Sequence, residues 1–146
     1  MRQPVLTFDV ALKLAQAALA KGQKLGCAPL AVGVVDLSGT ALVLLRSDGA
    51  PPMWARITMA KARTALDFGC STARVGELAT EHLQLMQDIV GLSDKARVTV
   101  AGGVPLFAGS IMVGAVGVAG DSSLNDESCA IHAAVAMGFA AEGRAE

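Results

Sequence analysis

The amino-acid sequence predicts an α+β fold in which helices pack on an antiparallel sheet. Strand-like segments follow one another with only short turns between them, at 30–36 and 40–46 and again between 95 and 118. Segments with helical periodicity stand in groups before, between and after these runs. Strands that are joined directly as hairpins run antiparallel, and grouped helices then pack on the sheet they form.

The chain is long enough to form one domain, 1–146, with a core of its own. Apolar residues make up 53% and aromatic residues only 3%, and the mean hydropathy is +0.51. This apolar surplus predicts burial between the subunits of a homo-oligomer. The net charge of −1 excludes the electrostatic footprint expected for nucleic-acid binding or an anionic membrane.

The N-terminus does not have the pattern of a signal peptide, and no apolar run is long enough for a membrane span, so we expect a cytoplasmic protein. The three cysteines, Cys27, Cys70 and Cys129, are odd in number and widely spaced. They indicate neither a disulfide framework nor a zinc motif, and no metal site is expected.

The first helix is expected to run from Thr7, whose side chain can cap it, to about Lys24. Apolar residues recur between them at helical spacing, and Gly26 ends the element. An apolar, β-branched run follows at 30–36, and a Ser-Gly turn leads into a second strand at 40–46. These segments predict a helix followed by a β-hairpin.

The middle of the chain is predicted to be helical. Two consecutive prolines break the strand pattern and favour the start of a helix over 53–68. Ser71 or Thr72 is expected to cap a short helix that runs through residue 78. The segment 80–90 has a weaker helical pattern and ends in a glycine.

The glycine-rich second half is predicted to hold three more strands and the last helix. Strands are expected over 95–101, 104–107 and 111–118, and a helix capped by a serine at 122 or 123 over 125–141. Each glycine costs backbone entropy, so their number here suggests tight turns or a close approach of the backbone to something else.

Short motifs occur in a fixed order along nearly the whole chain: Val34-Val35-Asp36, Arg46 with Asp48-Gly49-Ala50, Ala60 to Ala65, Gly102-Gly103-Val104-Pro105-Leu106, Gly114 to Val118, and Asp126-Glu127. In this order they resemble the GlcG/HbpS family of small haem-binding or haem-degrading proteins, which includes the C-terminal domain of PduO-type proteins. The resemblance implies a profilin-like fold, with a five-stranded antiparallel sheet and helices on both faces, and assembly into dimers or larger homo-oligomers.

The resemblance also implies haem as a candidate cofactor, bound through a His on the N-terminal helix. This sequence has no His between Thr7 and Gly26, and its two histidines are His82 and His132. Haem iron is held in proteins by His, Met, Cys or Tyr. A haem here would therefore need one of these two histidines, a Met or a Cys as its ligand, and no other cofactor is expected.

A ligand pocket is expected near the loop Gly102 to Pro105 and the start of the last helix. Gly102 and Gly103, followed by Val104 and Pro105, could present consecutive N–H groups to an anion, or could simply form a turn that needs positive φ. Asp126 lies at the helix start, where it could contact a ligand or cap the helix.

Five further residues are candidates for ligand binding or catalysis. Arg46, Lys61 and Arg63 interrupt apolar patterns and could pair with a carboxylate, or could form ion pairs within the protein. Glu127 is a candidate general base if it is desolvated. His132 follows Cys129 by three residues, which places both on neighbouring positions of one helix and permits either a functional pair or a plain helix face.

These residues allow three hypotheses. The first is a small-ligand-binding accessory protein of the GlcG/HbpS type, with haem among its candidate ligands. The second is an enzyme, such as a tautomerase, hydrolase or lyase, that acts on a small carboxylated catabolic metabolite through Glu127, His132 and Lys61. The third is an oligomerising module without a ligand.

Overall fold

The computed structural model describes residues 4–92 and 96–142 of the chain. In these residues the sheet has four strands, all antiparallel to their neighbours, in the spatial order β2 (Ala41–Arg46), β1 (Ala31–Val35), β4 (Ile111–Ala119) and β3 (Gly103–Ala108). The helices are α1 (Phe8–Leu25), α2 (Pro52–Phe68), α3 (Thr72–Glu81), α4 (Leu83–Leu92) and α5 (Ser123–Ala136).

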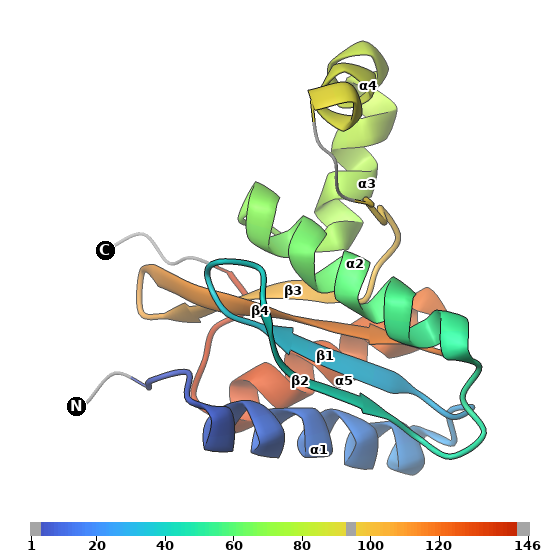
Figure 1. The fold of residues 1–146 in the computed structure, drawn as a ribbon, viewed down its shortest axis with the longest axis vertical. Helices are drawn as coiled ribbons and strands as arrows, with labels where there is room; N and C mark the ends of the chain where they lie inside the picture. The colour runs from blue at the N-terminus through green and yellow to red at the C-terminus, as the bar shows by residue number, and fades with distance from the viewer. Residues whose placement is uncertain (1–3, 93–95, 143–146) are drawn as a thin grey trace.

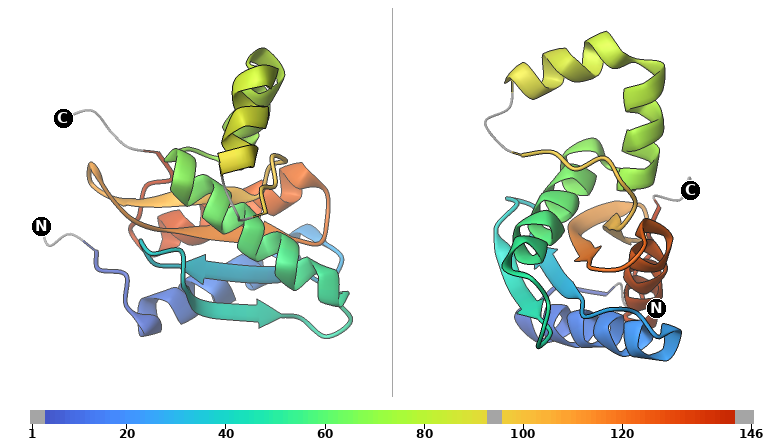
Figure 2. Two further views of the ribbon diagram at one scale, coloured as in Figure 1. Left: turned by 45° about the horizontal axis from the view of Figure 1, so that its top comes forward. Right: turned by 90° about the vertical axis from the view of Figure 1, so that its right-hand side faces the viewer.

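Helices cover both faces of the sheet (Figure 1). α2 lies across β1, β4 and β3 on one face, and α1 and α5 lie side by side on the other. α3 and α4 project away from the sheet beyond the end of α2 (Figure 2). The predicted α+β class and the helices on both faces are confirmed. No helix within the described ranges combines the length and apolarity needed to cross a membrane.

Serine and threonine side chains start three of the helices at the predicted places. The hydroxyl groups of Thr7, Ser71 and Ser122 each accept a hydrogen bond of 3.2 Å from the amide three residues further on. Each bond satisfies one of the amide groups that a first helical turn leaves without a partner. The alternative caps, Thr72 and Ser123, lie inside their helices.

The main core lies between the sheet and the pair formed by α1 and α5. All five residues of β1 are buried, as expected for a central strand covered on both faces. Its side chains Val32 and Val34 and those of Val116 and Val118 in β4 belong to this core, with Leu14 of α1. Where α1 and α5 meet, the buried residues are mostly alanines, whose small side chains let the two helices pack closely.

Three glycines form a row across the sheet on the face that α2 covers. Gly33 in β1 is paired with Gly117 in β4, and Gly117 is paired with Gly103 in β3. A Cβ atom on Gly117 would collide with the carbonyl oxygen of Thr58 in α2, and one on Gly103 with that of Lys61. These glycines therefore let the backbone of α2 lie directly on the sheet, which accounts for much of the glycine-rich pattern.

A fifth strand is predicted over 95–101. The structure describes residues 96–101 of this segment, and they do not form a strand. These residues pack against α2 instead of extending the sheet. Arg97 forms an ion pair with Asp67 at 2.7 Å, and the amide of Val98 donates to the side chain of Thr64 at 3.2 Å. Side chains of α2 thus take the hydrogen bonds that a strand would have given to β3.

The last helix is shorter than predicted: it ends at Ala136 and not near residue 141. Gly138, with φ of 85°, turns the chain out of the helix. Ala140 then exchanges two backbone hydrogen bonds, of 2.8 and 2.9 Å, with Phe107 at the outer edge of β3. A short bridge therefore occupies part of the sheet edge where a fifth strand would have paired.

Candidate functional site

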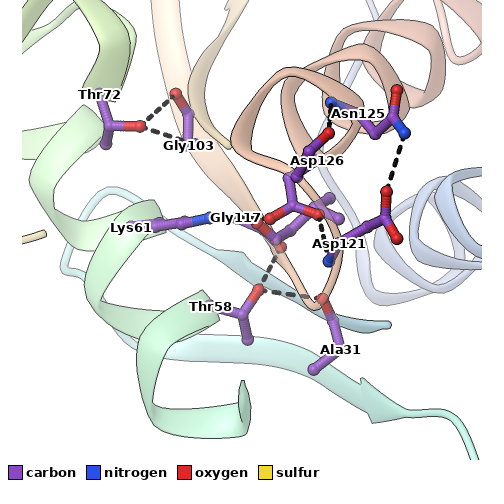
Figure 3. A network of polar contacts seen from close by, with 11 residues as sticks. Ala31, Thr58, Lys61, Thr72, Gly103, Gly117, Asp121, Asn125 and Asp126 are labelled. Carbon is purple, nitrogen blue, oxygen red and sulfur yellow. Dashed lines mark hydrogen bonds and ion pairs between the residues drawn. The ribbon is translucent and has the colours of Figure 1, made fainter. Parts of the chain in front are cut away.

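Two of the predicted site residues, Lys61 and Asp126, meet where the end of β4 leads into α5. The Nζ atom of Lys61 lies 3.1 Å from Oδ2 of Asp126 and donates to the carbonyl oxygen of Val118 at 2.9 Å (Figure 3). Both charged side chains are only 3% exposed. A Cβ atom on Gly102 would lie 2.6 Å from Nζ, so the glycine makes room for the ammonium group.

Both oxygen atoms of the Asp126 carboxylate have a polar partner. Its Oδ1 atom accepts a hydrogen bond of 3.0 Å from the amide of Asp121, while Oδ2 faces Lys61. Burial raises the pKa of Asp126 above its usual value, against the opposing effects of these hydrogen bonds and the Lys61 charge. The pair ties α2 to α5 inside the protein, and its groups point toward one another and not toward solvent (Figure 3).

The predicted anion-binding loop is also packed against its neighbours. Gly102 has φ of 132°, and its carbonyl oxygen accepts from the amide of Val118 at 2.9 Å. The amide of Gly103 donates to the hydroxyl of Thr72 at 2.9 Å (Figure 3). Val104 and Pro105 are buried in β3. In this arrangement the Gly103 amide serves the contact between β3 and α3 and does not face an open cavity.

The remaining catalytic candidates lie apart from Lys61. His132 is exposed on the outer side of α5, whereas Cys129, three residues earlier, is fully buried. Glu127 is half-buried, and none of the described residues forms a hydrogen bond with its buried Oε2 atom. Arg63 donates from Nε to the carbonyl oxygen of Gly39 in the β1–β2 turn at 3.0 Å.

A cavity of about 540 Å³ lies at the C-terminal end of α1. Its walls come from α1, from the loop between α1 and β1, and from the loop after β2, and they include Leu19, Gly22, Cys27, Pro29, Leu30 and Arg46. The lining also includes the polar residues Gln23, Ser47 and Asp48, so apolar and polar surface are present in similar amounts. The volume lies in the usual range of small-molecule sites. Of the predicted ligand-binding residues, Arg46 is the one that this cavity contains.

The thiol of Cys27 is the reactive side chain in the lining of this cavity. It lies close to the carboxylate of Asp121 and to the thiol of Cys129, and both affect its pKa. Burial, followed by the negative charge of Asp121, raises the pKa of Cys27, and burial raises that of Cys129 to about 12. Both groups are therefore protonated thiols at neutral pH in the absence of a bound cation.

Asp121 fixes the position of the loop that carries Cys27. Its Oδ1 atom accepts from the amide of Ala28 at 3.0 Å, and its Oδ2 atom accepts from the side-chain amide of Asn125 at 2.8 Å. The Asn125 bond, helped by backbone amides, lowers the pKa of Asp121 to about 2. A charged Asp121 thus links the end of α1 to the first turn of α5.

A second, wider and more open hollow, of about 840 Å³, lies between α3, residues 99–101 and Ser123. This is the neighbourhood in which the sequence predicts a pocket, next to Gly102 and the start of the last helix. The residues that line it are mostly small and apolar, and its one charged side chain among the described residues is the carboxylate of Glu77. Among the described residues, the lining of this hollow therefore contains neither a cationic side chain nor a sulfur atom that could ligate a metal.

Comparison with known proteins identifies the family. The family model described as haem-degrading protein HbpS-like matches residues 6–135. The chain belongs to the HbpS-like family. The solved structure of a PduOC:haem complex is 28% identical, with a TM-score of 0.84 over 94% of this chain and 99% of that one. The structure of HbpS is 33% identical, with a TM-score of 0.80 over 94% of each chain.

A curated relative supports the same assignment. An uncharacterised 15.0 kDa protein of Citrobacter freundii, from the dhaT–dhaS intergenic region, is 31% identical over 124 residues. The match covers 83% of this HbpS-like chain and 84% of the relative. The predicted resemblance to the GlcG/HbpS family is therefore confirmed.

The sequence did not single out Cys27 in this HbpS-like chain, because its partner groups are remote along the chain. Asp121 and Cys129 lie about a hundred residues later, and only the packing of α1 against α5 brings them to Cys27. The one local signal was position: Cys27 directly follows Gly26, the glycine that ends α1 with φ of 70°. A residue at that place leaves the helix and faces the neighbouring loops.

Proposed function

We propose that this protein is a small-ligand-binding accessory protein whose ligand is haem or a similar flat, apolar, carboxylated ring. Family membership and the solved haem complex of a structural relative support this class of ligand. The observation that carries the proposal for this chain is the cavity at the end of α1. It combines apolar side chains, the Arg46 cation beside the Asp48 carboxylate, and a side chain of a type that ligates haem iron.

The residues of the cavity fit such a ligand. Leu19, Pro29 and Leu30 supply apolar surface for a ring, and the Cys27 thiol supplies a ligand atom once it loses its proton. Arg46 supplies a positive charge for a carboxylate at the mouth of the cavity. When bound, the iron would add redox chemistry that the side chains alone lack.

The same cavity offers a reason why α1 can lack the His that the family resemblance implies. α1 contributes Leu19, Gly22 and Gln23 to the wall, and Cys27 follows one residue after the helix ends. A ligand atom therefore remains on the chain segment that the resemblance associates with haem. We infer that Cys27 takes the place of the helix His.

Titration of the purified protein with hemin, followed by absorbance in the Soret region, tests this proposal. We expect a saturable band that Cys27→Ser removes or shifts. Cys70→Ser is the matched control and should titrate like the wild type, because Cys70 lies beyond the end of α2 and not in this cavity. The absence of a saturable band, or a band that depends on His82 or His132 and not on Cys27, would contradict the proposal.

Homo-oligomerisation, as predicted from composition, is supported by the outer side of α5. Leu124, Ile131 and Val135 are exposed there by 75%, 38% and 62%. Exposed apolar side chains gathered on one helix mark a surface for another protein. We expect light scattering to give a mass of at least two chains, and Val135→Glu, placed on this surface, to lower it.

A further inference from the structure

Two cysteines that are far apart in the sequence lie together at the C-terminal end of α1. The amide of Cys27 donates to the carbonyl oxygen of Gly22 at 2.9 Å. The Sγ atom of Cys129, which comes from α5, lies 3.8 Å from the place that a Cβ atom on Gly22 would occupy. The two thiols lie close enough for each to affect the pKa of the other. Gly22 thus lies beside both cysteines, and the space that its missing side chain leaves is filled by the side chain of Leu30.

The two thiols differ in their access to solvent. Cys27 is half-buried and lines the cavity, whereas Cys129 is 0% exposed. A small oxidant that enters the cavity therefore meets Cys27 first. Cys129 is the thiol that lies beside it, and Cys70 lies beyond the end of α2, outside this cavity.

We propose that Cys27 and Cys129 form an intramolecular dithiol–disulfide couple that reacts with hydrogen peroxide. The Cys27 thiol, protonated at neutral pH because its pKa is raised, first releases its proton. The small thiolate fraction attacks one peroxide oxygen and the O–O bond breaks. The departing hydroxide takes up the released proton, so the products are a sulfenic acid and one water. The Cys129 sulfur then attacks the Cys27 sulfur, the S–O bond breaks, and the hydroxyl group leaves as a second water with the Cys129 proton. The two sulfur atoms lose two electrons, which reduce one peroxide to two waters.

The fold assigns the required movement to the loop of Cys27. A disulfide needs the two sulfur atoms to approach to about 2.05 Å. Cys129 lies in the middle of α5, among the alanines that pack on α1, and is held on all sides. Cys27 lies in the short loop after Gly26, so the approach of the two sulfur atoms has to come from this loop. Asp121 keeps the loop close through its hydrogen bond to Ala28.

This couple does not depend on haem being the ligand of the cavity. If Cys27 does hold haem iron, a disulfide to Cys129 removes that ligand, so oxidation and haem binding exclude one another. Without haem, the couple still changes the chemistry of the cavity wall from a thiol to a disulfide.

Thiol counting by alkylation and mass spectrometry on the reduced full-length protein tests the inference. After hydrogen peroxide treatment we expect two of the three thiols to be lost, a mass lower by two hydrogens, and a disulfide-linked peptide pair that contains Cys27 and Cys129. Cys70 should remain alkylated. Because these measurements use the wild-type chain, the result does not depend on whether a variant folds.

Two variants sharpen the test. In Cys129→Ser, the Cys27 sulfenic acid lacks its partner and should be trapped by dimedone, whereas Cys70→Ser should form the same linked pair as the wild type. Retention of all three thiols under excess peroxide, a link through Cys70, or a link between two chains would overturn the inference. All of these measurements are made on haem-free protein, so failure of the couple is distinguishable from failure of the proposed function.

Discussion

The two faces of the sheet are built on different principles. On the α2 face, glycines bring helix backbone into direct contact with strand backbone, and the polar groups bond to one another. On the other face, α1 and α5 pack through side chains, and the end of α1 leaves a cavity. Lys61 and Cys27 illustrate the difference: the first is enclosed with its partner, and the second lines open space.

This contrast shows that the surroundings of a buried polar residue decide whether it has a structural or a ligand-binding role. A charge that is fully partnered and closed from solvent holds helices together, as Lys61 and Asp126 do between α2 and α5. A titratable group that is partly exposed in an apolar cavity is available to a ligand, as Cys27 is. Only the surroundings of each residue in the fold separate the two roles.

The largest effect is expected from breaking the enclosed ion pair. Lys61→Met leaves the carboxylate of Asp126 buried without its countercharge, so the free energy of unfolding should fall by about 3–5 kcal/mol. Urea denaturation followed by circular dichroism measures this loss. The double variant Lys61→Met/Asp126→Leu should recover most of it, because it removes the stranded charge. A loss below about 1 kcal/mol for the single variant would match an exposed ion pair and contradict an enclosed one.

A smaller loss is expected from adding a methyl group between α2 and the sheet. Gly117→Ala places a Cβ atom against the carbonyl oxygen of Thr58, and overpacking of this kind costs about 1–3 kcal/mol. Gly91→Ala is the matched control: it lies in α4 with nothing within 4 Å of its Cβ position, and alanine favours a helix. Equal stability of the two variants would show that α2 does not approach the sheet so closely.

Substitutions of two arginines test whether the ligand binds in the cavity or on the α2 face of the sheet. Arg46→Ala should weaken hemin binding by about two- to fivefold, since an exposed ion pair contributes about 0.2–1 kcal/mol. Arg63→Ala removes the same charge beside α2, where a shallow hollow also contains Arg56, and should leave the affinity unchanged. The opposite order of effects would place the ligand on the α2 face.

The smallest effect is expected from acid titration. It tests the link that Asp121 makes between the end of α1 and the first turn of α5. The pKa of Asp121 is about 2, below its ordinary value of 3.8, so the folded state holds this carboxylate charged more firmly than the unfolded chain does. Its stabilisation is present above about pH 4 and is lost as the pH falls toward 2. Thermal unfolding of Asp121→Asn should therefore depend less on pH in this window than that of the wild type. Asp9→Asn, at an exposed ion pair of α1, is the control.

Local signals in the sequence were enough for most of the fold. The capping residue Thr7, the hairpin around residues 36–40 and the glycine at 26 act on their immediate neighbours, and the structure has them as predicted. The segment 95–101 has the composition of a strand, but contacts with α2 decided its course. Such contacts join residues 30 and 34 positions apart, which a local pattern does not encode.

The candidate site was harder to predict for the same reason. Lys61 stood out as a charge on a semi-apolar face, and its partner, Asp126, lies 65 residues away. The glycines at 102 and 103 indicated close approach, but the sequence did not show that the approaching group is α2 and not a ligand. No local pattern in the sequence connects Cys27 with Cys129, because only the packing of α1 against α5 brings them together.

The most direct test of the account is to locate the bound ligand. Zinc protoporphyrin, a diamagnetic stand-in for haem, can be titrated into isotope-labelled protein while amide resonances are followed. The account predicts the largest shifts at Gly22, Cys27 and Leu30, around the cavity at the end of α1. Largest shifts at Gly102 and Ser123, or at Arg56 and Arg63 beside α2, would contradict it.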